Sequence, residues 1–485
     1  MSSIAQIYSL EFKNLLKERL SYFIHDISDN LIQNILSRND TKYIKLLSDL
    51  EKNIKILILD ILKDLISFFN NKFINSKERK ELYHINVRND HRSIVTTIGT
   101  LDFYRTYFES KDRKEHFYFI DQLLGIDSYA RYDCNTKANV ISLSTKTNQK
   151  LAGELTLLNY HSLSSSTLNI IPRQTINRWI KQWKVPMIKY NPISIDGDTL
   201  YIMADEKWIH EQIYNRPLED LDKHKFIMSK EFVCFSGIEQ KGKRRTLKDR
   251  FIFITSSTST WNDFLDIVTQ IYDFEKLNKI VFLSDAGKWL INGAPDLKMF
   301  PHNKIIMCLC EFHVRQKVNR ITTNQEYRDK LNKAIDDDKK KEFISLILEI
   351  KELKKDNPKR LEKLEEYEKY ILNHWKKIKN MAASPCKSSM ESHISHYIAG
   401  YFSSRPKAFS RNTIENYLKL QEAKINDIDI KTLFLKSYKN DSVVTYNQKE
   451  LDFSIFDNSS SSNIPIISSG KVDNLYKALF GLAHC

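Results

Sequence analysis

Two carboxylates follow short apolar segments that have the composition of buried strands. Asp205 comes directly after residues 200–204, and Asp285 comes directly after residues 280–284. In an open α/β sheet, polar groups at the carboxyl ends of neighbouring strands face a common crevice. A lone Asp in such a place is usually a turn or a helix cap. Two of them on neighbouring strands favour a metal site instead, because Mg²⁺ needs only a few carboxylates besides waters and substrate phosphates.

A third carboxylate has to come from later in the chain, and Glu391 is the candidate. It lies in a segment, 388–402, that we expect to be helical. Three such carboxylates can hold two ions about 3.5–4 Å apart, which clamp the attacking and leaving oxygens of a phosphodiester. In this arrangement Asp205 bridges the ions, and Asp285 and Glu391 hold one each. No covalent intermediate is needed, so no Ser or Tyr nucleophile is required.

The elements around these residues predict an α/β domain. Strands are expected over 200–204, 231–238 and 250–255, followed by a helix over 261–272 and strands over 279–284 and 304–309. A basic turn, 240–245, joins the second strand to the third. This order is that of an RNase H-like sheet. A charged, all-α insertion follows, and its expected inward face consists of Phe343, Ile344, Leu346, Ile347, Ile350 and Leu353.

The region before this domain begins with helical periodicity. Two alternating runs about Gly99, over 94–98 and 101–107, then predict a β-hairpin. These patterns divide the chain into a helical region, a hairpin and helix-turn-helix region, a first catalytic part, the helical insertion, a Glu-bearing helix and a tail with a Ser-rich linker. The expected boundaries are 1–90, 91–190, 195–315, 316–384, 385–415 and 416–485.

An amphipathic helix is expected after Pro172. Its apolar face contains Ile176, Trp179, Ile180 and Trp183. Together with a helix over 151–160 and a Ser-rich turn at 162–167, it predicts a helix-turn-helix that binds duplex DNA. The alternative is an ordinary surface helix with a solvated basic face. The side chains that would contact DNA are Arg173, Gln174, Asn177, Arg178 and Lys181.

Composition limits the classes of function that remain. The 485 residues include 75 Lys and Arg against 61 Asp and Glu, so the net charge of +14 favours a polyanionic partner over an acidic solvating role. An AT-rich genome would also enrich Lys, so the charge supports DNA binding without proving it. Gly and Pro total 21 residues, far below the roughly 12% of average usage. This composition disfavours collagen-like, linker-dominated and turn-dense β architectures and favours a helix-rich chain.

The location expected from the sequence is the cytoplasm. Six Cys in so long a chain do not form a disulfide framework, and the N-terminus lacks the pattern of a signal peptide. Charged residues interrupt the most apolar stretch, 54–69, so it cannot span a bilayer. We expect a soluble prokaryotic protein that associates with the nucleoid and not with a membrane.

Three stretches resemble the ISLre-type insertion-sequence transposases, a prokaryotic, Mutator-like DDE family. Residues 201–206 resemble the strand with the family's first Asp, and 284–293 resemble its second-Asp loop, in which a Trp and a following Gly recur. Residues 391–410 resemble its Glu segment, with Ser-Ser-Arg-Pro at 403–406 as the most specific match. The resemblance covers roughly 91–415. It implies an RNase H-like catalytic domain with two Mg²⁺ or Mn²⁺ ions per active site, acting on duplex DNA as a homodimer or a higher synaptic oligomer.

The sequence also departs from the family pattern. The family usually has Asp-Gly-Ala at the second Asp, where this chain has Asp285-Ala286-Gly287. Where the family has Asp-x-Phe-His, this chain has Cys310 and His313, which fit the broader Cys/Asp-x-x-His signature of Mutator and hAT transposases. All three carboxylates are kept.

The remaining polar residues have two interpretations. Cys308, Cys310 and His313, with Cys386, His393 or His396, could bind a structural zinc ion. Alternatively, Cys310, His313, His393 and His396 line the active site. Arg405 and Lys407 are expected to contact the DNA backbone, with a solvated charge as the alternative.

These observations give a first hypothesis and two alternatives. The first is a DDE transposase that binds its element ends and performs metal-dependent cleavage and strand transfer. The second is a catalytically inactive, domesticated DNA-binding protein derived from a transposase. The third is an RNase H-like nuclease without strand transfer.

Overall fold

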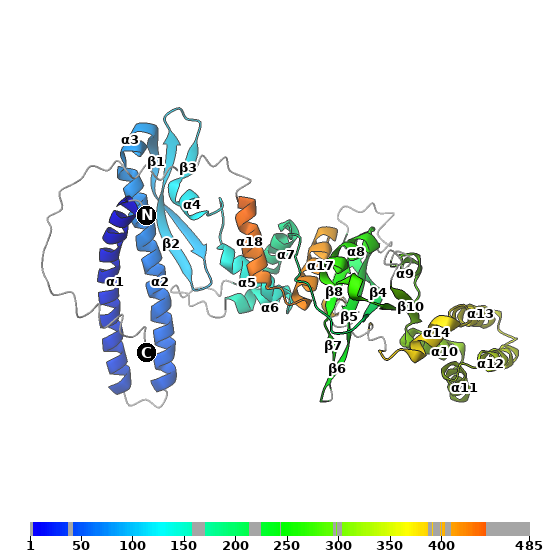
Figure 1. The fold of residues 1–485 in the computed structure, drawn as a ribbon. Coiled ribbons are helices and arrows are strands. Elements are labelled where there is room, and N and C mark those ends of the chain that lie inside the picture. Colours follow the sequence, from blue (N-terminus) through cyan, green and yellow to red (C-terminus); the bar gives the residue numbers. More distant parts are fainter. Residues whose placement is uncertain are drawn as a thin grey trace. The chain divides into compact units, whose positions relative to one another are not determined.

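The computed structural model describes residues 3–36, 42–157, 170–212, 225–242, 244–293, 297, 303–386, 390, 398, 400–402 and 409–442. These residues divide into two compact units, one ending at Asp133 and the other spanning Cys134–Asp441. Figure 1 labels their helices and strands. Within the described ranges, no helix has both the length and the apolar character needed to cross a membrane.

The first unit packs a small antiparallel sheet against a long helix. Its elements are α1 (Ser3–Leu36), α2 (Lys42–Asn75), α3 (Lys77–Leu82), β1 (Tyr83–Val95), β2 (Thr100–Ser110), β3 (His116–Tyr118) and α4 (Phe119–Leu124). The expected hairpin about Gly99 is confirmed, with Ile94 opposite Leu101. The core joins Ile66 and Phe73 of α2 to Phe108 of β2. The helical region is shorter than expected, because β1 already begins at Tyr83.

The second unit contains the predicted α/β elements. Its first part comprises α5 (Cys134–Ser144), α6 (Gln149–Thr156), α7 (Arg173–Gln182), β4 (Thr199–Glu211), β5 (Lys225–Phe235), β6 (Gly237–Lys241), β7 (Arg244–Lys248), β8 (Phe251–Thr255), α8 (Thr260–Ile271), η2 (Phe274–Lys276), β9 (Lys279–Ser284), α9 (Lys288–Gly293) and β10 (Lys304–Leu309). Its second part comprises α10 (Glu311–Ile321), α11 (Gln325–Asp336), α12 (Lys340–Leu353), α13 (Pro358–Asn373), α14 (Trp375–Ala383), α16 (Gly400–Phe402), α17 (Arg411–Ile425) and α18 (Ile430–Ser442).

The main sheet of this unit has the order β10-β9-β4-β5-β8 within the described residues. β4, β5 and β8 pair antiparallel, whereas β9 and β10 run parallel to β4. Each expected strand is present, but β4 does not end at Asp205 as expected; it continues to Glu211 beside β5. The basic turn expected at 240–245 forms the end of the narrow ribbon β6–β7, which projects from the sheet (Figure 1).

Helices cover the sheet and close one of its edges. α8 packs on one face, where the rings of Phe264 and Phe232 stack at 4.1 Å. α17 lies along β8, and Asn426, which follows α17, bonds the strand's backbone. Its Oδ1 accepts from the Ile252 N–H at 2.9 Å, and its Nδ2 donates to the Ile252 carbonyl at 2.6 Å. Residues 416–485 were expected to be tail; instead, residues 416–441 belong to this unit, and Asn426 satisfies an otherwise unpaired strand edge.

The helical insertion is present as α10–α14 and begins slightly earlier than expected. Of the predicted inward face, Phe343, Leu346, Ile347 and Ile350 are buried, and Ile344 is half-buried. Leu353 is 71% exposed, contrary to prediction, because it is the last residue of α12.

Candidate metal centre

Strand register brings the two predicted aspartates together. β4 and β9 run parallel, and their last pair is Ala204 with Ser284. Asp205 and Asp285 are therefore the first residues beyond that pair on adjacent strands, which lie about 4.8 Å apart. β9 stops at this point, whereas β4 continues against β5. The sheet is therefore open at this point, with Asp205 on one side of the opening and Asp285 on the other.

A third carboxylate, Glu206, joins them. Oxygens of Asp205, Glu206 and Asp285 lie within 4.8 Å of one another, and this is the only such group of potential metal ligands among the described residues. Neighbouring side chains of a strand leave opposite faces, so alternation alone gives no reason to group Glu206 with Asp205. The two meet because β9 ends at Ser284. In the sequence, the only signal for this grouping is the adjacency of Asp205 and Glu206.

Several hydrogen bonds orient the three carboxylates. The Gly287 N–H donates to Asp285 Oδ1 at 2.8 Å, and the Glu206 N–H donates to Asp205 Oδ1 at 2.8 Å. The indole N–H of Trp289 donates to Glu206 Oε2. From the insertion, the hydroxyl of Tyr370 donates to the Asp285 carbonyl at 2.6 Å. The loop after β9 and helix α13 thus fix the geometry of the group.

The electrostatics of the group favour a cation. Burial raises the pKa of Asp205 to about 7, and the charges of Asp285 and Glu206 add to the shift. Burial also raises the pKa of Glu206, despite the hydrogen bond from Trp289. Hard oxygen donors in a half-buried place match the ligand preference of Mg²⁺ or Mn²⁺, and a bound divalent cation would stabilise the charged carboxylates. The residues present therefore fit the expected metal.

A fourth carboxylate, Glu231, lies beside this group and is not among the site residues predicted from the sequence. It is directly opposite Asp205 in the pairing of β4 with β5, and its side chain is fully buried. Burial and the nearby Asp205 raise its pKa to about 8. The signal in the sequence was an acidic residue in an apolar strand. However, Glu231 was the first residue of the strand predicted at 231–238, and acidic residues at the start of a strand usually face solvent.

Cys310 and His313 lie next to the aspartates. The Cys310 N–H donates to the Ser284 carbonyl at 2.8 Å. A hydrogen bond with the Cys310 thiol raises the pKa of His313, which burial lowers and the charges of Asp205 and Asp285 raise further. Cys310 and His313 thus lie beside the two aspartates, while their predicted packing near Glu391 involves a residue outside the described ones.

The described cysteines do not assemble a zinc site. Cys308 and Cys386 lie beside Tyr201, which is hydrogen-bonded to the Cys386 thiol, while Cys310 is bonded to His313. Among the described residues, the Cys and His of the zinc alternative form no group of three ligands. Glu391, His393, His396, Arg405 and Lys407 lie outside the described residues.

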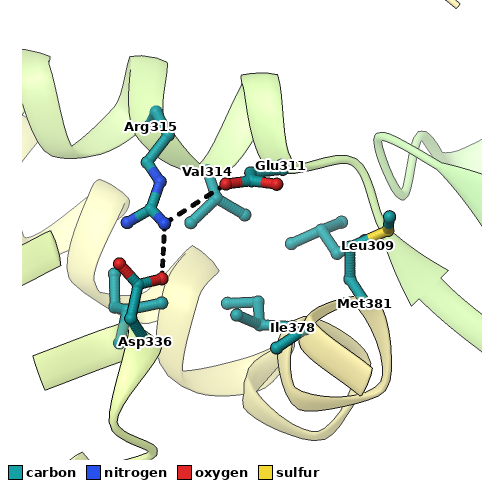
Figure 2. Close-up of a pocket in the computed structure, with 9 residues that line it drawn as sticks. Leu309, Glu311, Val314, Arg315, Asp336, Ile378 and Met381 are labelled. Atoms are coloured by element: carbon teal, nitrogen blue, oxygen red, sulfur yellow. Dashed lines mark hydrogen bonds and ion pairs between the residues drawn. The ribbon is translucent and has the colours of Figure 1, made fainter. Parts of the chain in front are cut away.

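A small pocket beside α10 is separate from the carboxylates. Figure 2 shows Glu311, Val314 and Arg315 facing Asp336 and Ile378 across it. Arg315 forms ion pairs with Asp336 and Glu311, and the pocket's volume is about 40 Å³. A cavity of this size holds a few waters at most, and ligand pockets are usually about 300–1,000 Å³, so it is too small for a nucleotide.

The predicted DNA-reading helix is present as α7, and its apolar face is largely as expected. Ile176, Ile180 and Trp183 are buried, and Trp179 is half-buried. Asn416 Nδ2 of α17 donates to the carbonyls of Ile180 and Trp183, at 2.6 and 2.8 Å. On the other side, Arg173, Gln174, Arg178 and Lys181 are exposed and Asn177 is half-buried. The preceding turn, 162–167, lies outside the described residues.

The hairpin and the helix-turn-helix helices, expected to form one region at 91–190, fall into different units. β1 and β2 pack on α2 in the first unit, while α5–α7 belong to the second. In the second unit, α6 approaches the start of α7 so closely that a Cβ at Gly153 would lie 2.3 Å from the Ile171 carbonyl oxygen.

Replacing Ala286 by Gly should stabilise the folded protein. Its φ of 65° is left-handed, a conformation that costs a residue with a Cβ about 1–2 kcal/mol. The next position needs its Gly, because a Cβ there would lie 3.2 Å from Asp285 Oδ1. We expect Ala286→Gly to raise the free energy of unfolding by about 0.5–1 kcal/mol, measured by urea denaturation. A lower stability would contradict the strain; Ala382→Gly, in helix α14, should instead destabilise the protein.

Comparison with known proteins places this chain in a family. The model of the Uncharacterised protein family (UPF0236) matches residues 36–437. A UPF0236 protein of Caldanaerobacter subterraneus subsp. tengcongensis is 24% identical over 423 residues, 84% of this chain and 85% of the relative. Another from that organism is 27% identical over 430 residues, 84% and 80% of the two chains. A UPF0236 protein of Streptococcus gallolyticus is 24% identical over 300 residues, 60% and 62% of the two chains. The chain therefore belongs to the UPF0236 family.

Proposed function

We propose that this protein is a DDE transposase of the ISLre type, which binds the ends of its element and catalyses metal-dependent DNA cleavage and strand transfer. The observation that carries the proposal is the acidic group at the end of β9. Asp205 and Asp285 stand side by side in the sheet, with Glu206 within 4.8 Å. A group of carboxylates in a basic protein is explained if divalent cations bind to it and a phosphodiester binds to the cations.

The order of the strands supports an RNase H-like fold for the catalytic domain. Three consecutive sheet strands, β4, β5 and β8, pair antiparallel, and the chain then crosses through α8 to place β9 and β10 beyond β4. The order of these strands and of α8 along the chain is the order that the sequence analysis associated with an RNase H-like sheet. The strand pairing puts the first Asp on the central strand, beside the end of the next parallel strand.

Each residue of the site has a proposed part in the reaction. Asp205 and Asp285 would hold Mg²⁺ or Mn²⁺, with Glu206 beside them and Glu391, by resemblance, as the third member of the DDE set. When bound, two such ions supply charge relief and an activated attacking oxygen. The Gly287 N–H keeps Asp285 in place, and Trp289 keeps Glu206 in place. The charges of both aspartates raise the pKa of His313. His313 can therefore balance charge near the substrate.

The names of the relatives also support a mobile element. One name joins eleven loci of a single Caldanaerobacter strain, and another joins four. A gene present at many loci of one genome is what repeated transposition leaves behind.

Two basic parts of the chain are suited to duplex DNA. One is the polar face of α7, and the other is the ribbon β6–β7, whose sequence between 241 and 245 is Lys-Gly-Lys-Arg-Arg. An α-helix or an antiparallel ribbon fits the major groove, and basic side chains contact phosphates. A synaptic complex would need at least two copies of the chain, one for each element end.

Charge reversal on α7 should weaken DNA binding. We expect the double variant Arg173→Glu/Arg178→Glu to lower the affinity for element-end DNA by roughly 10- to 100-fold. The slope of log K against log salt should fall by about 2, since each phosphate contact contributes about 0.9. Fluorescence anisotropy at several salt concentrations measures both. Lys341→Glu, on the exposed side of α12, should change neither; an unchanged affinity in the double variant would remove α7 from the DNA surface.

The proposed function is tested with the purified chain and DNA carrying the inverted repeats that flank its gene. A transposase nicks at the repeat ends in Mg²⁺ or Mn²⁺ and joins the freed 3′ ends to a second DNA. Binding without cleavage would favour the domesticated, inactive protein. Cleavage of branched or hybrid substrates with no joined product would favour the nuclease without strand transfer.

A further inference from the structure

Glu231 occupies an unusual position for an acidic residue. It lies within β5, directly opposite Asp205 of β4, and its side chain has no exposed surface. Directly opposed residues of an antiparallel pair point to the same face, with Cβ atoms about 4.5–5.5 Å apart. The carboxyl of Glu231 therefore lies on the same side of the sheet as that of Asp205.

The carboxyl of Glu231 has no hydrogen-bond partner for either oxygen among the described residues. The hydroxyl of Ser229, two residues earlier and so on the same face, is also buried without a partner. Buried polar groups are nearly always hydrogen-bonded, and an exception calls for an explanation such as a missing ion.

Glu422 shows what a structural buried carboxylate looks like in the same unit. It is also buried, but its Oε1 accepts from the Tyr190 hydroxyl at 2.6 Å and its Oε2 accepts from the Ile254 N–H at 2.8 Å. Its position is explained by these two bonds, which join α17 to Tyr190 and to β8. No such bonds explain Glu231.

We propose that Glu231 is a further ligand of the metal centre, binding a divalent cation together with Asp205 from the β5 side. The inference rests on the proposed function, whose cation it shares. Two carboxylates in direct register can bind one Mg²⁺ or Mn²⁺, because their oxygens need to lie only about 2.1 Å from the ion. The metal centre would then extend from Asp285 on β9, through Asp205, to Glu231 on β5.

The test is calorimetric titration of the full-length protein with MnCl₂ in the absence of DNA. We expect Glu231→Gln to weaken Mn²⁺ binding at least tenfold, while its melting temperature without cation is unchanged or higher. Glu422→Gln is the matched control: it should lower the melting temperature and leave Mn²⁺ binding unchanged. Should Glu231→Gln not fold, Glu231→Met removes the carboxylate with a similar volume and the same expectation. Wild-type affinity in either folded Glu231 variant would overturn the inference.

The result also separates this inference from the proposed function. If Mn²⁺ binding does not depend on Glu231 but DNA cleavage depends on Asp205 and Asp285, the inference fails and the proposed function stands. If Mn²⁺ binding depends on Glu231 but the wild-type protein neither cleaves nor joins DNA, the cation site stands and the proposed function fails. A wild-type protein that binds no Mn²⁺ overturns the Glu231 site directly.

Discussion

Replacing Asp205 by Asn should abolish cation-dependent DNA cleavage and leave DNA binding intact. Asp205 stands between Asp285 on one neighbouring strand and Glu231 on the other, so the group has no substitute for it. An amide keeps the shape of the side chain but removes the negative charge that holds a cation. We expect cleavage to fall at least about a thousandfold, or about 4 kcal/mol in the activation free energy. A nicking assay on element-end DNA in Mg²⁺ and in Mn²⁺ measures the loss.

The same substitution should not destabilise the fold. The pKa of Asp205 is raised from 3.8 to about 7, mainly by burial. Its contribution to stability is therefore fully present below pH 3.8 and is lost as the pH rises through about 7, because the folded protein disfavours the charged form. Without cation at pH 8, Asp205→Asn should be as stable as the wild type or more stable, by up to roughly 3 kcal/mol. Urea denaturation at pH 5 and pH 8 gives the comparison.

Asp266→Asn provides the matched control. Asp266 is an exposed residue of α8 in the same unit, outside the acidic group. This variant should cleave DNA like the wild type. Cleavage by Asp205→Asn at more than a tenth of the wild-type rate would contradict the proposed mechanism, and loss of DNA binding in that variant would point to a structural role instead.

The strands of the sheet and the two aspartates could be predicted from the sequence because local sequence patterns indicate them. Each strand is a short apolar run, and Asp205 and Asp285 follow two such runs at the same register. The other two carboxylates were not accessible in this way. Glu206 joins the group only because β9 ends one residue before Asp285, and Glu231 joins it only through the pairing of β5 with β4. Both depend on which strands become neighbours, which no local pattern specifies.

The same reason explains the errors in domain organisation. Residues 416–442 follow the predicted catalytic segments and carry no motif, yet Asn426 satisfies the edge of β8 and Asn416 satisfies the end of α7. The hairpin 94–107 precedes the helix-turn-helix region in the chain, but its apolar face is complementary to α2. The predicted boundaries grouped segments that are neighbours in sequence. They were wrong here because long-range packing decides where each segment is buried.

Gly293 is the last residue of α9, the helix that follows the loop after β9, and the chain has no room for a side chain there. A Cβ at this position would lie 1.8 Å from Trp261 Nε1 and 1.9 Å from its Cδ1. Trp261 cannot easily move away, because its ring packs edge-on against Phe232 at 5.2 Å. The same Nε1 donates to the Trp289 carbonyl at 3.0 Å, and the Trp289 indole in turn donates to Glu206. Gly293 is therefore linked through Trp261 and Trp289 to Glu206.

Gly293→Ala should therefore affect both stability and the metal centre. We expect the free energy of unfolding to fall by about 2–4 kcal/mol, as in an overpacked core, and the melting temperature to fall by roughly 5–10 °C. Mn²⁺ binding should weaken as well, since displacing Trp261 moves Trp289 and with it Glu206. Thermal denaturation and calorimetric titration with MnCl₂ measure the two effects.

Gly197→Ala is the matched control. At Gly197, a Cβ would meet nothing within 4 Å, so this variant should change stability by less than about 0.5 kcal/mol and leave Mn²⁺ binding unchanged. Equal behaviour of the two variants would show that the Gly293–Trp261 contact does not position the site.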